Sequence, residues 1–304
     1  MNELNVAAVV LSWVDASDEN AALQWLPSDA PEGDGTYSCP TLYVGNSTGE
    51  TIRQLIHDNQ ISDMSVILDA PSYEAPTYTL ISHLEGTGKT NNSIVLYTHS
   101  DGPSIIEENG PIMLLTLAEY FSRNLPFINL DLVMTTGHLS GDKLNESDWM
   151  GQRPDLMANA YAEISIEHFG AIEWKDVQTE SGPVYTATGW TEPMWTFANG
   201  SSESDAMRST YLEAFEGSPD YLRMALLQPL RVNGVRSKWY GVGGASKWGY
   251  SDVPSVGIIP QPDYLWASMI DGGYSKYDHD QAVAQLEVII RAIKSLDQQF
   301  CSGQ

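Results

Sequence analysis

The sequence predicts an α/β protein with a mostly parallel central sheet flanked by helices, preceded by a small β-rich portion. Three observations lead to this fold class. From Asn92 onward, short apolar runs alternate with segments of helical periodicity, which favours a parallel sheet covered on both faces. Before that point, the apolar runs are separated by Pro, Gly, Asp and Ser clusters. With 304 residues, 42% of them hydrophobic, the chain is long enough to bury a sizeable core.

The N-terminal part of the chain is typical of short strands interrupted by one helix. The helical segment is Glu50–His57, and turn-forming residues bound the apolar runs on either side of it. We expect residues 1–76 to form a β-rich region and residues 77–304 to form the α/β domain. The predicted strands are Val6–Trp13, Thr41–Val44, Ser65–Leu68 and Tyr78–Leu84.

The rest of the chain supplies the strands and helices of the predicted α/β domain. Residues Asn109–Arg123 are predicted to form a helix, with Asn109 as its cap and a proline in its first turn. Residues Asp278–Phe300 are predicted to form a surface helix with one apolar stripe that faces the core. The predicted parallel strands are Ile94–Tyr97, Leu130–Thr135, Ala162–Ile166 and Val256–Ile259.

Charge and composition limit the function classes. Forty acidic residues against fifteen basic ones give a net charge of −25, which repels nucleic acid and anionic lipid. No run of eighteen apolar residues and no signal-peptide pattern occurs, so we expect no membrane partner. The acidity, together with N-x-Ser/Thr triplets at Asn46, Asn91, Asn145 and Asn199, favours a secreted glycoprotein. The two cysteines, Cys39 and Cys301, permit one disulfide but no Cys-rich zinc site, and the sequence leaves the oligomeric state open.

Groups that bind metals or transfer protons follow several predicted strands. His99 and Asp101 come after the first strand, and Glu108 stands just before the predicted helix cap. His138 follows the second strand, and Glu167-His168 ends the third. In an open α/β sheet, ligands gather at the carboxyl ends of the strands, so we expect these groups to share one site. Taken singly, each also fits a surface hydrogen bond or a favourable charge at a helix start.

The order of these segments resembles the M28 family of zinc-dependent aminopeptidases and carboxypeptidases. Thr98-His99-Ser100-Asp101 resembles the family's first His-x-Asp motif, and Glu108-Asn109 resembles its metal-bridging carboxylate. Glu167-His168-Phe169-Gly170 resembles its later acidic ligand segment. The resemblance implies a zinc-peptidase-like fold over about residues 77–296. The N-terminal region in turn resembles part of a protease-associated domain.

The chain departs from the family pattern at the general base. Where the family has Glu-Glu, this chain has Gly137-His138. The resemblance therefore implies a divergent site that holds one zinc ion rather than two. Its metal ligands would be His99, Glu108, His138 and Glu167, and a displaced carboxylate such as Glu107 or Glu173 would act as base.

Three functions remain open at this point. The first is a metal-assisted hydrolase, peptidase-like, acting on a peptide or small molecule, with Glu108, His138, Glu167 and His168 at its catalytic centre. The second is a metal-independent hydrolase or lyase, acting on a small molecule or sugar, in which Glu108 and Glu167 are acid and base and His138 or His168 stabilises charge. The third is a non-catalytic binding protein with an aromatic pocket lined by Trp190, Trp195, Trp239 and Trp248.

Overall fold

The computed structural model contains a seven-stranded central sheet. It describes residues 6–23, 39–69, 76–102, 104–136, 148–198, 202–226, 231–232, 235–236, 253–264 and 273–303. The strand order in the sheet is β10-β9-β13-β6-β4-β5-β3. Its strands are β3 (Leu80–Leu84), β4 (Ser93–His99), β5 (Asn129–Thr135), β6 (Ala160–Ile166), β9 (Met194–Ala198), β10 (Met224–Leu226) and β13 (Ser255–Pro260).

The middle of the sheet is parallel. β4 pairs in parallel with both β5 and β6, and β6 pairs in parallel with β13. Toward the two edges, β3 runs antiparallel to β5, and β9 runs antiparallel to β13. These four parallel strands are the four predicted from the apolar runs, so the predicted fold class is confirmed. Every residue of β4, β5 and β13 is buried, as expected for strands covered on both faces.

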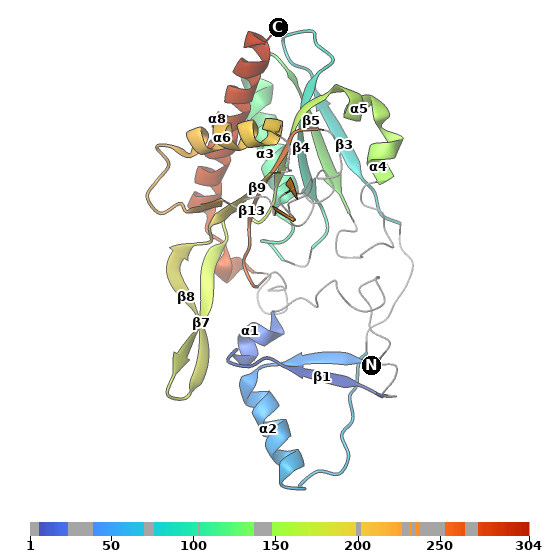
Figure 1. Cartoon of the computed structure of the whole chain (residues 1–304), viewed down its shortest axis with the longest axis vertical. Coiled ribbons are helices and arrows are strands. Elements are labelled where there is room, and N and C mark those ends of the chain that lie inside the picture. Colours follow the sequence, from blue (N-terminus) through green and yellow to red (C-terminus); the bar gives the residue numbers. More distant parts are fainter. Residues whose placement is uncertain are drawn as a thin grey trace.

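Three helices cover one face of the sheet (Figure 1). They are α3 (Gly110–Arg123), α6 (Ser202–Phe215) and α8 (His279–Ser302). Their buried side chains, among them Leu117 and Ile289, pack against alternate strand residues in the larger hydrophobic core. Asp278 caps α8, because its side chain accepts a hydrogen bond from the backbone N–H of Gln281. The predicted helices at 109–123 and 278–300 are therefore confirmed to within two residues at each end.

Two short helices lie over the opposite face of the sheet. They are α4 (Asp148–Gln152) and α5 (Pro154–Asn159). A smaller apolar cluster joins Leu156 of α5 to Tyr97 and Val133 of the sheet. The sheet is therefore the middle of three layers, which orients alternate side chains of each strand toward different surroundings.

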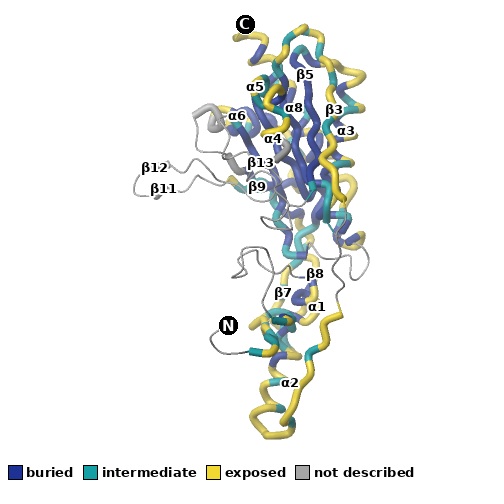
Figure 2. The backbone as a smooth tube through the Cα atoms, turned by 90° about the vertical axis from the view of Figure 1, so that its right-hand side faces the viewer, coloured by how far each residue is buried: buried dark blue, intermediate teal, exposed yellow. Residues whose placement is uncertain are grey.

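A separate N-terminal unit lies beyond the carboxyl ends of the parallel strands, at the lower end of Figure 1. It consists of β1 (Val9–Ser12), α1 (Asp18–Ala22), β2 (Thr41–Val44) and α2 (Asn46–His57). β1 and β2 pair in parallel. This unit carries little dark blue in Figure 2, whereas the central strands of the sheet above it, such as β4 and β5, are buried along their length. The domain division between residues 76 and 77 stays a prediction.

A long β-hairpin connects the N-terminal unit to the rest of the molecule. Its strands are β7 (Ile172–Thr179) and β8 (Gly182–Thr191), inserted between β6 and β9. Asp176 of β7 accepts hydrogen bonds from the backbone N–H of Ser17, at 3.2 Å, and from the side chain of Asn20, at 2.7 Å. A short antiparallel pair, β11 (Arg231–Val232) with β12 (Val235–Arg236), and a 3-10 helix, η4 (Tyr274–Lys276), complete the described elements.

Two local expectations differ from the structure, and the sequence left the pairing of the two cysteines open. Ser65–Leu68 forms no strand, because it pairs with no described strand and leaves Ile67 84% exposed. Asn109 does not cap α3 through its side chain, which instead donates a hydrogen bond to the carbonyl of Phe169 at 2.7 Å. Cys39 and Cys301 are both free thiols.

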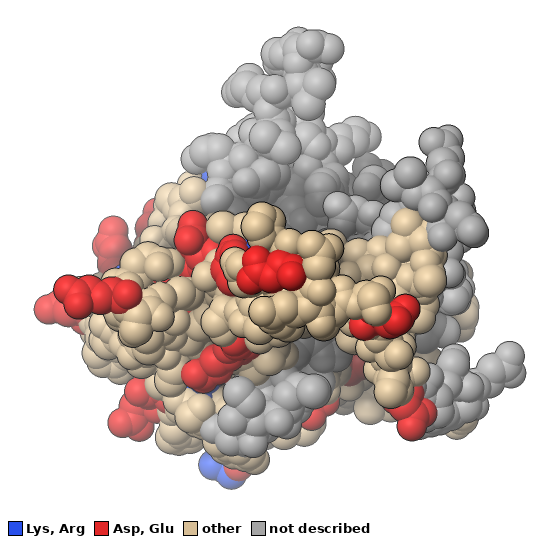
Figure 3. All heavy atoms as spheres, turned by 90° about the horizontal axis from the view of Figure 1, so that it is seen from below, with Lys and Arg blue, Asp and Glu red and all other residues tan. Residues whose placement is uncertain are grey.

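The described surface reflects the acidic composition. In the view of Figure 3, Asp and Glu side chains are spread over the face, whereas Lys and Arg are sparse among the described residues. No helix among the described ranges is long and apolar enough to cross a bilayer. The absence of nucleic-acid and membrane partners stays a prediction.

Candidate metal centre

Two loops at the carboxyl ends of neighbouring strands meet to form the candidate site. His99 is the last residue of β4, and Glu167 and His168 directly follow β6, the strand that pairs with β4. Because parallel strands end at the same edge of the sheet, these side chains share one location. The sequence prediction that the His99 and Glu167-His168 segments converge is therefore correct.

A tight turn between β4 and α3 brings a third acidic side chain to this place. The backbone N–H of Glu107 donates to Oγ of Ser104 at 3.1 Å, and the N–H of Glu108 donates to the carbonyl of Ser104 at 3.1 Å. A Cβ at Gly102 would lie only 2.4 Å from Cγ of Glu107, so this turn requires a glycine there. The bond from Asn109 to Phe169 then ties the turn to the loop that follows β6.

His99, Glu107 and His168 form a buried cluster of metal-ligand type. One ligand atom from each lies within 4.8 Å of the other two. The three residues are only 1%, 3% and 4% exposed, respectively. Nε2 of His168 lies 2.9 Å from Oε2 of Glu107. Two imidazoles and one carboxylate match the His₂Glu ligand set of catalytic zinc sites, which leave one coordination position open.

Backbone carbonyls fix the orientation of both imidazole rings. Nδ1 of His99 donates to the carbonyl of Asp101 at 2.8 Å, and Nδ1 of His168 donates to the carbonyl of Pro260 at 2.7 Å. A carbonyl oxygen only accepts, so Nδ1 must carry the proton in each ring. In the neutral form, each Nε2 then presents its lone pair toward the cluster, as metal-binding histidines do. The carboxylate of Asp101, expected to orient His99, lies farther away, at 3.8 Å.

His168 has an unusual backbone conformation. Its φ of 59° lies in the left-handed region, which is uncommon for residues other than glycine. Such conformations persist where the surrounding structure enforces them, and they are concentrated at functional sites. Burial disfavours the charged imidazole, but the nearby carboxylates of Glu107 and Glu167 outweigh this effect and raise the pKa of His168.

Glu167 lies beside the cluster, directly after β6, and continues a line of polar side chains from that strand. Its Oε2 is 3.6 Å from Nε2 of His99 and 3.9 Å from Nε2 of His168. Two and four residues earlier, Ser165 and Glu163 point to the same side of the strand because strand side chains alternate. Ser165 hydrogen-bonds Glu163, and complete burial raises the pKa of the Glu163 carboxyl well above its usual range. Glu167 therefore has a carboxylate oxygen within 4 Å of the Nε2 atoms of both imidazoles.

The other residues predicted for the site have different placements. Glu108 is exposed at the edge of the cluster. Partial desolvation of its carboxyl group raises its pKa, and repulsion from Asp101 and Glu107 adds to this effect. Glu173 lies on β7, where hydrogen bonds to Arg223 and Thr188 outweigh desolvation and lower its pKa. His138 lies outside the described residues.

Glu107 takes the place in the cluster that the sequence analysis assigned to Glu108. The sequence contains a signal for this, since Ser104-Ile105-Ile106-Glu107 matches the Ser-x-x-Glu pattern of a helix start. The fully buried side chain of Ile106 anchors this turn in the interior. Which of the two adjacent glutamates faces inward depends on this anchoring, and a pattern of charges alone does not reveal it.

Comparisons with known proteins find similarity in structure only. No protein-family model matches the chain, and no curated protein matches its sequence. A leucine aminopeptidase precursor from Bacteroides thetaiotaomicron is similar at 11% identity and a TM-score of 0.47, over 71% of this chain and 76% of that one. A glutaminyl cyclase from Tannerella forsythia has 14% identity and a TM-score of 0.47, over 71% and 77%.

A Zn-dependent exopeptidase from Parabacteroides distasonis has 12% identity and a TM-score of 0.45, over 72% of this chain and 76% of that one. The chain spans 44% of the length of a further similar protein, from Clostridium acetobutylicum. At TM-scores below 0.5, these similarities establish neither a shared family nor an activity.

Proposed function

We propose that this protein is a metal-assisted hydrolase in which His99, Glu107 and His168 hold one zinc ion. The observation that carries the proposal is the orientation of the two rings, since both Nδ1 atoms donate to backbone carbonyls, which leaves both Nε2 atoms as the possible metal ligands of the buried cluster with Glu107. A buried carboxylate and two imidazoles whose Nδ1 atoms carry the proton form a donor set that suits zinc once Nε2 is deprotonated. A zinc ion bound there would act as a Lewis acid toward a substrate carbonyl.

The side chains around the cluster supply the proton transfers. Glu167 lies close to both imidazoles, so its Oε2 is placed to accept a proton from the attacking water. Glu108 lies at the exposed rim with a raised pKa, which increases the fraction of its carboxyl that carries a proton for the leaving group. These roles suit hydrolysis of an amide or ester bond in a peptide or small molecule.

Metal content is the first test of this function. Protein purified without a metal-affinity resin should contain about one equivalent of zinc by mass spectrometry of the metal. His168→Ala should lose this zinc, because it removes one of three ligands. The matched control is His83→Ala: His83 of β3 also contacts a carboxylate, Asp131 at 2.8 Å, but it lies outside the cluster. Zinc-free wild-type protein, or equal loss in both variants, would contradict the proposal.

Turnover is the second test. Across a panel of aminoacyl-p-nitroanilides and short peptides, Glu167→Gln should retain zinc but lose roughly a hundredfold or more in kcat, as expected for removal of a general base. Glu108→Gln should show a smaller loss. Turnover that persists in chelator-treated, zinc-free protein would instead favour metal-independent acid-base hydrolysis.

A further inference from the structure

A cavity lies apart from the candidate metal centre. It has a volume of about 420 Å³ and lies between the end of the β7–β8 hairpin and the first turn of α8. This volume falls within the range of about 300–1,000 Å³ that is typical of small-molecule sites. Its lining includes Trp190, Thr191, Tyr221, Asp278, Asp280 and Gln281, none of which belongs to the metal cluster.

Two aromatic side chains at this cavity are open to solvent. Trp190 is 56% exposed and Tyr221 is 44% exposed. Oγ1 of Thr191 donates to the backbone carbonyl of Tyr221 at 2.7 Å, which holds the two segments together. Large aromatic surfaces are usually packed in the interior, so two exposed aromatic side chains that line one cavity are candidates for ligand contacts.

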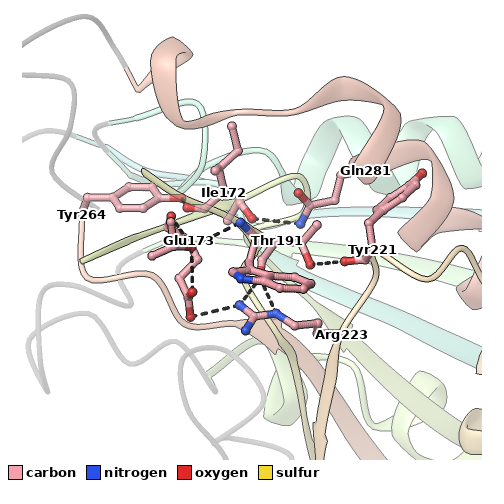
Figure 4. Close-up of polar contacts among 10 residues, drawn as sticks. Ile172, Glu173, Thr191, Tyr221, Arg223, Tyr264 and Gln281 are labelled. Atoms are coloured by element: carbon pink, nitrogen blue, oxygen red, sulfur yellow. Dashed lines mark hydrogen bonds and ion pairs between the residues drawn. The ribbon is translucent and has the colours of Figure 1, made fainter. Parts of the chain in front are cut away.

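An internal cation already occupies a position over the Trp190 ring. The guanidinium carbon of Arg223 is 5.7 Å from the ring centroid. Figure 4 shows Arg223 between Glu173, with which it pairs at 3.0 Å, and the carbonyl of Thr191. The positive charge of Arg223 is therefore balanced by Glu173. Arg223 does not neutralise the two carboxylates that line the cavity, Asp278 and Asp280.

The carboxylates of the cavity come from the start of α8. Oδ1 of Asp278 accepts from the backbone N–H of Gln281 at 2.8 Å, and the side chain of Gln281 donates to the carbonyl of Ala171 at 2.9 Å. Neither Asp278 nor Asp280 forms an ion pair with a Lys or Arg in the described part of the chain. The helix dipole contributes only about half a positive charge here. Two carboxylates therefore leave the cavity negative.

We propose that this cavity binds a guanidinium group, presented by an arginine-type ligand. A planar guanidinium stacks on indole and phenol rings and donates to carboxylates in a bidentate fork. Trp190 and Tyr221 supply the rings, and Asp278 and Asp280 supply the carboxylates. The proposal does not depend on zinc or on the hydrolase function, because the two sites share no side chain.

Calorimetric titration with L-arginine amide tests the proposal, with L-citrulline amide as the matched neutral probe. Citrulline has nearly the same shape but carries no charge on its side chain. Arginine amide should bind in the presence of a chelator, and citrulline amide should bind at least about tenfold more weakly, equivalent to 1.4 kcal/mol. Absence of arginine amide binding up to millimolar concentration, or equal binding of both probes, would overturn it.

Substitutions then locate the binding. Asp280→Asn should weaken binding of arginine amide at least about threefold, and Trp190→Ala should do the same. The control Glu287→Gln removes one charge from an exposed position of the same helix and should leave binding unchanged. Affinity that is unaffected by Asp280→Asn, or lowered equally by Glu287→Gln, would show that any binding is non-specific attraction to the acidic surface.

Discussion

The N-terminal unit and the α/β domain are stabilised in different ways. The domain buries a large core in which strands, α3, α6 and α8 share apolar contacts. The N-terminal unit buries less apolar surface, and surface hydrogen bonds such as those from Ser47 and Thr48 to Asp18 join its α2 to α1. The sequence pattern is a good guide where apolar burial dominates. It is a poor guide where a few polar contacts decide the arrangement.

The two regions also differ in how their acidic groups respond to the environment. In the N-terminal unit, hydrogen bonds from Ser47 and Arg53 lower the pKa values of Asp18 and Glu50. In the α/β domain, burial raises the pKa of Glu192 to about 7. The charged form is therefore favoured at Asp18 and Glu50 and disfavoured at Glu192.

The largest expected effect is the loss of stability caused by a cavity in the α/β core. Ile164 of β6 is 1% exposed, so Ile164→Ala should lower the free energy of unfolding by about 2–5 kcal/mol. Urea unfolding of the full chain measures this. The control is Ile56→Ala in α2, where the side chain is 56% exposed and the expected change is under about 0.5 kcal/mol. Similar losses in the two variants would contradict the distinction between the regions.

The second effect is a pH dependence of opposite sign in the two regions. The folded-state pKa of Glu192 is raised from 4.5 to about 7, so the folded state binds the proton more tightly than the unfolded state does. The stability of the domain should therefore fall by up to about 3 kcal/mol as the pH rises from about 4.5 to about 7. Acidification below the ordinary pKa of Asp18 should instead weaken the N-terminal unit, because a lowered pKa stabilises only the charged form.

Glu192→Gln tests this pH dependence. In the variant, the free energy of unfolding should no longer decrease as the pH rises through this range. Urea unfolding at pH 5 and pH 8 measures the difference. The exposed Glu287→Gln variant should keep the slope of the wild type. A slope that is unchanged in Glu192→Gln would show that other groups determine the pH response.

The smallest effect is expected where the two regions meet. Asp176→Ala removes the acceptor for Ser17 and Asn20 and should weaken docking of the N-terminal unit by roughly 1–3 kcal/mol. Limited proteolysis should then cut within residues 6–57 faster, while the unfolding midpoint of the α/β domain stays the same. If cleavage is unchanged, other contacts hold the N-terminal unit in place.

The candidate site was predictable in its location but not in its full composition. Strand ends at His99 and Glu167-His168 could be recognised from apolar runs that stop at polar residues. Glu107 could not be separated from Glu108 by charge, because the two are adjacent and both precede the α3 helix. The turn that contains Ser104 and the buried Ile106 determines which glutamate faces the histidines.

The parallel sheet, its four central strands, the two long helices and the edge at which ligand-type residues gather were all predictable from the sequence. Each of these follows from periodicity and turn residues along a short stretch of chain. The cluster itself depends on long-range contacts, because the carbonyl of Pro260 that orients His168 lies 92 positions along the chain. Likewise, Asp176 meets Ser17 across 159 positions. Contacts between distant residues depend on how whole elements pack, and local patterns do not encode that packing.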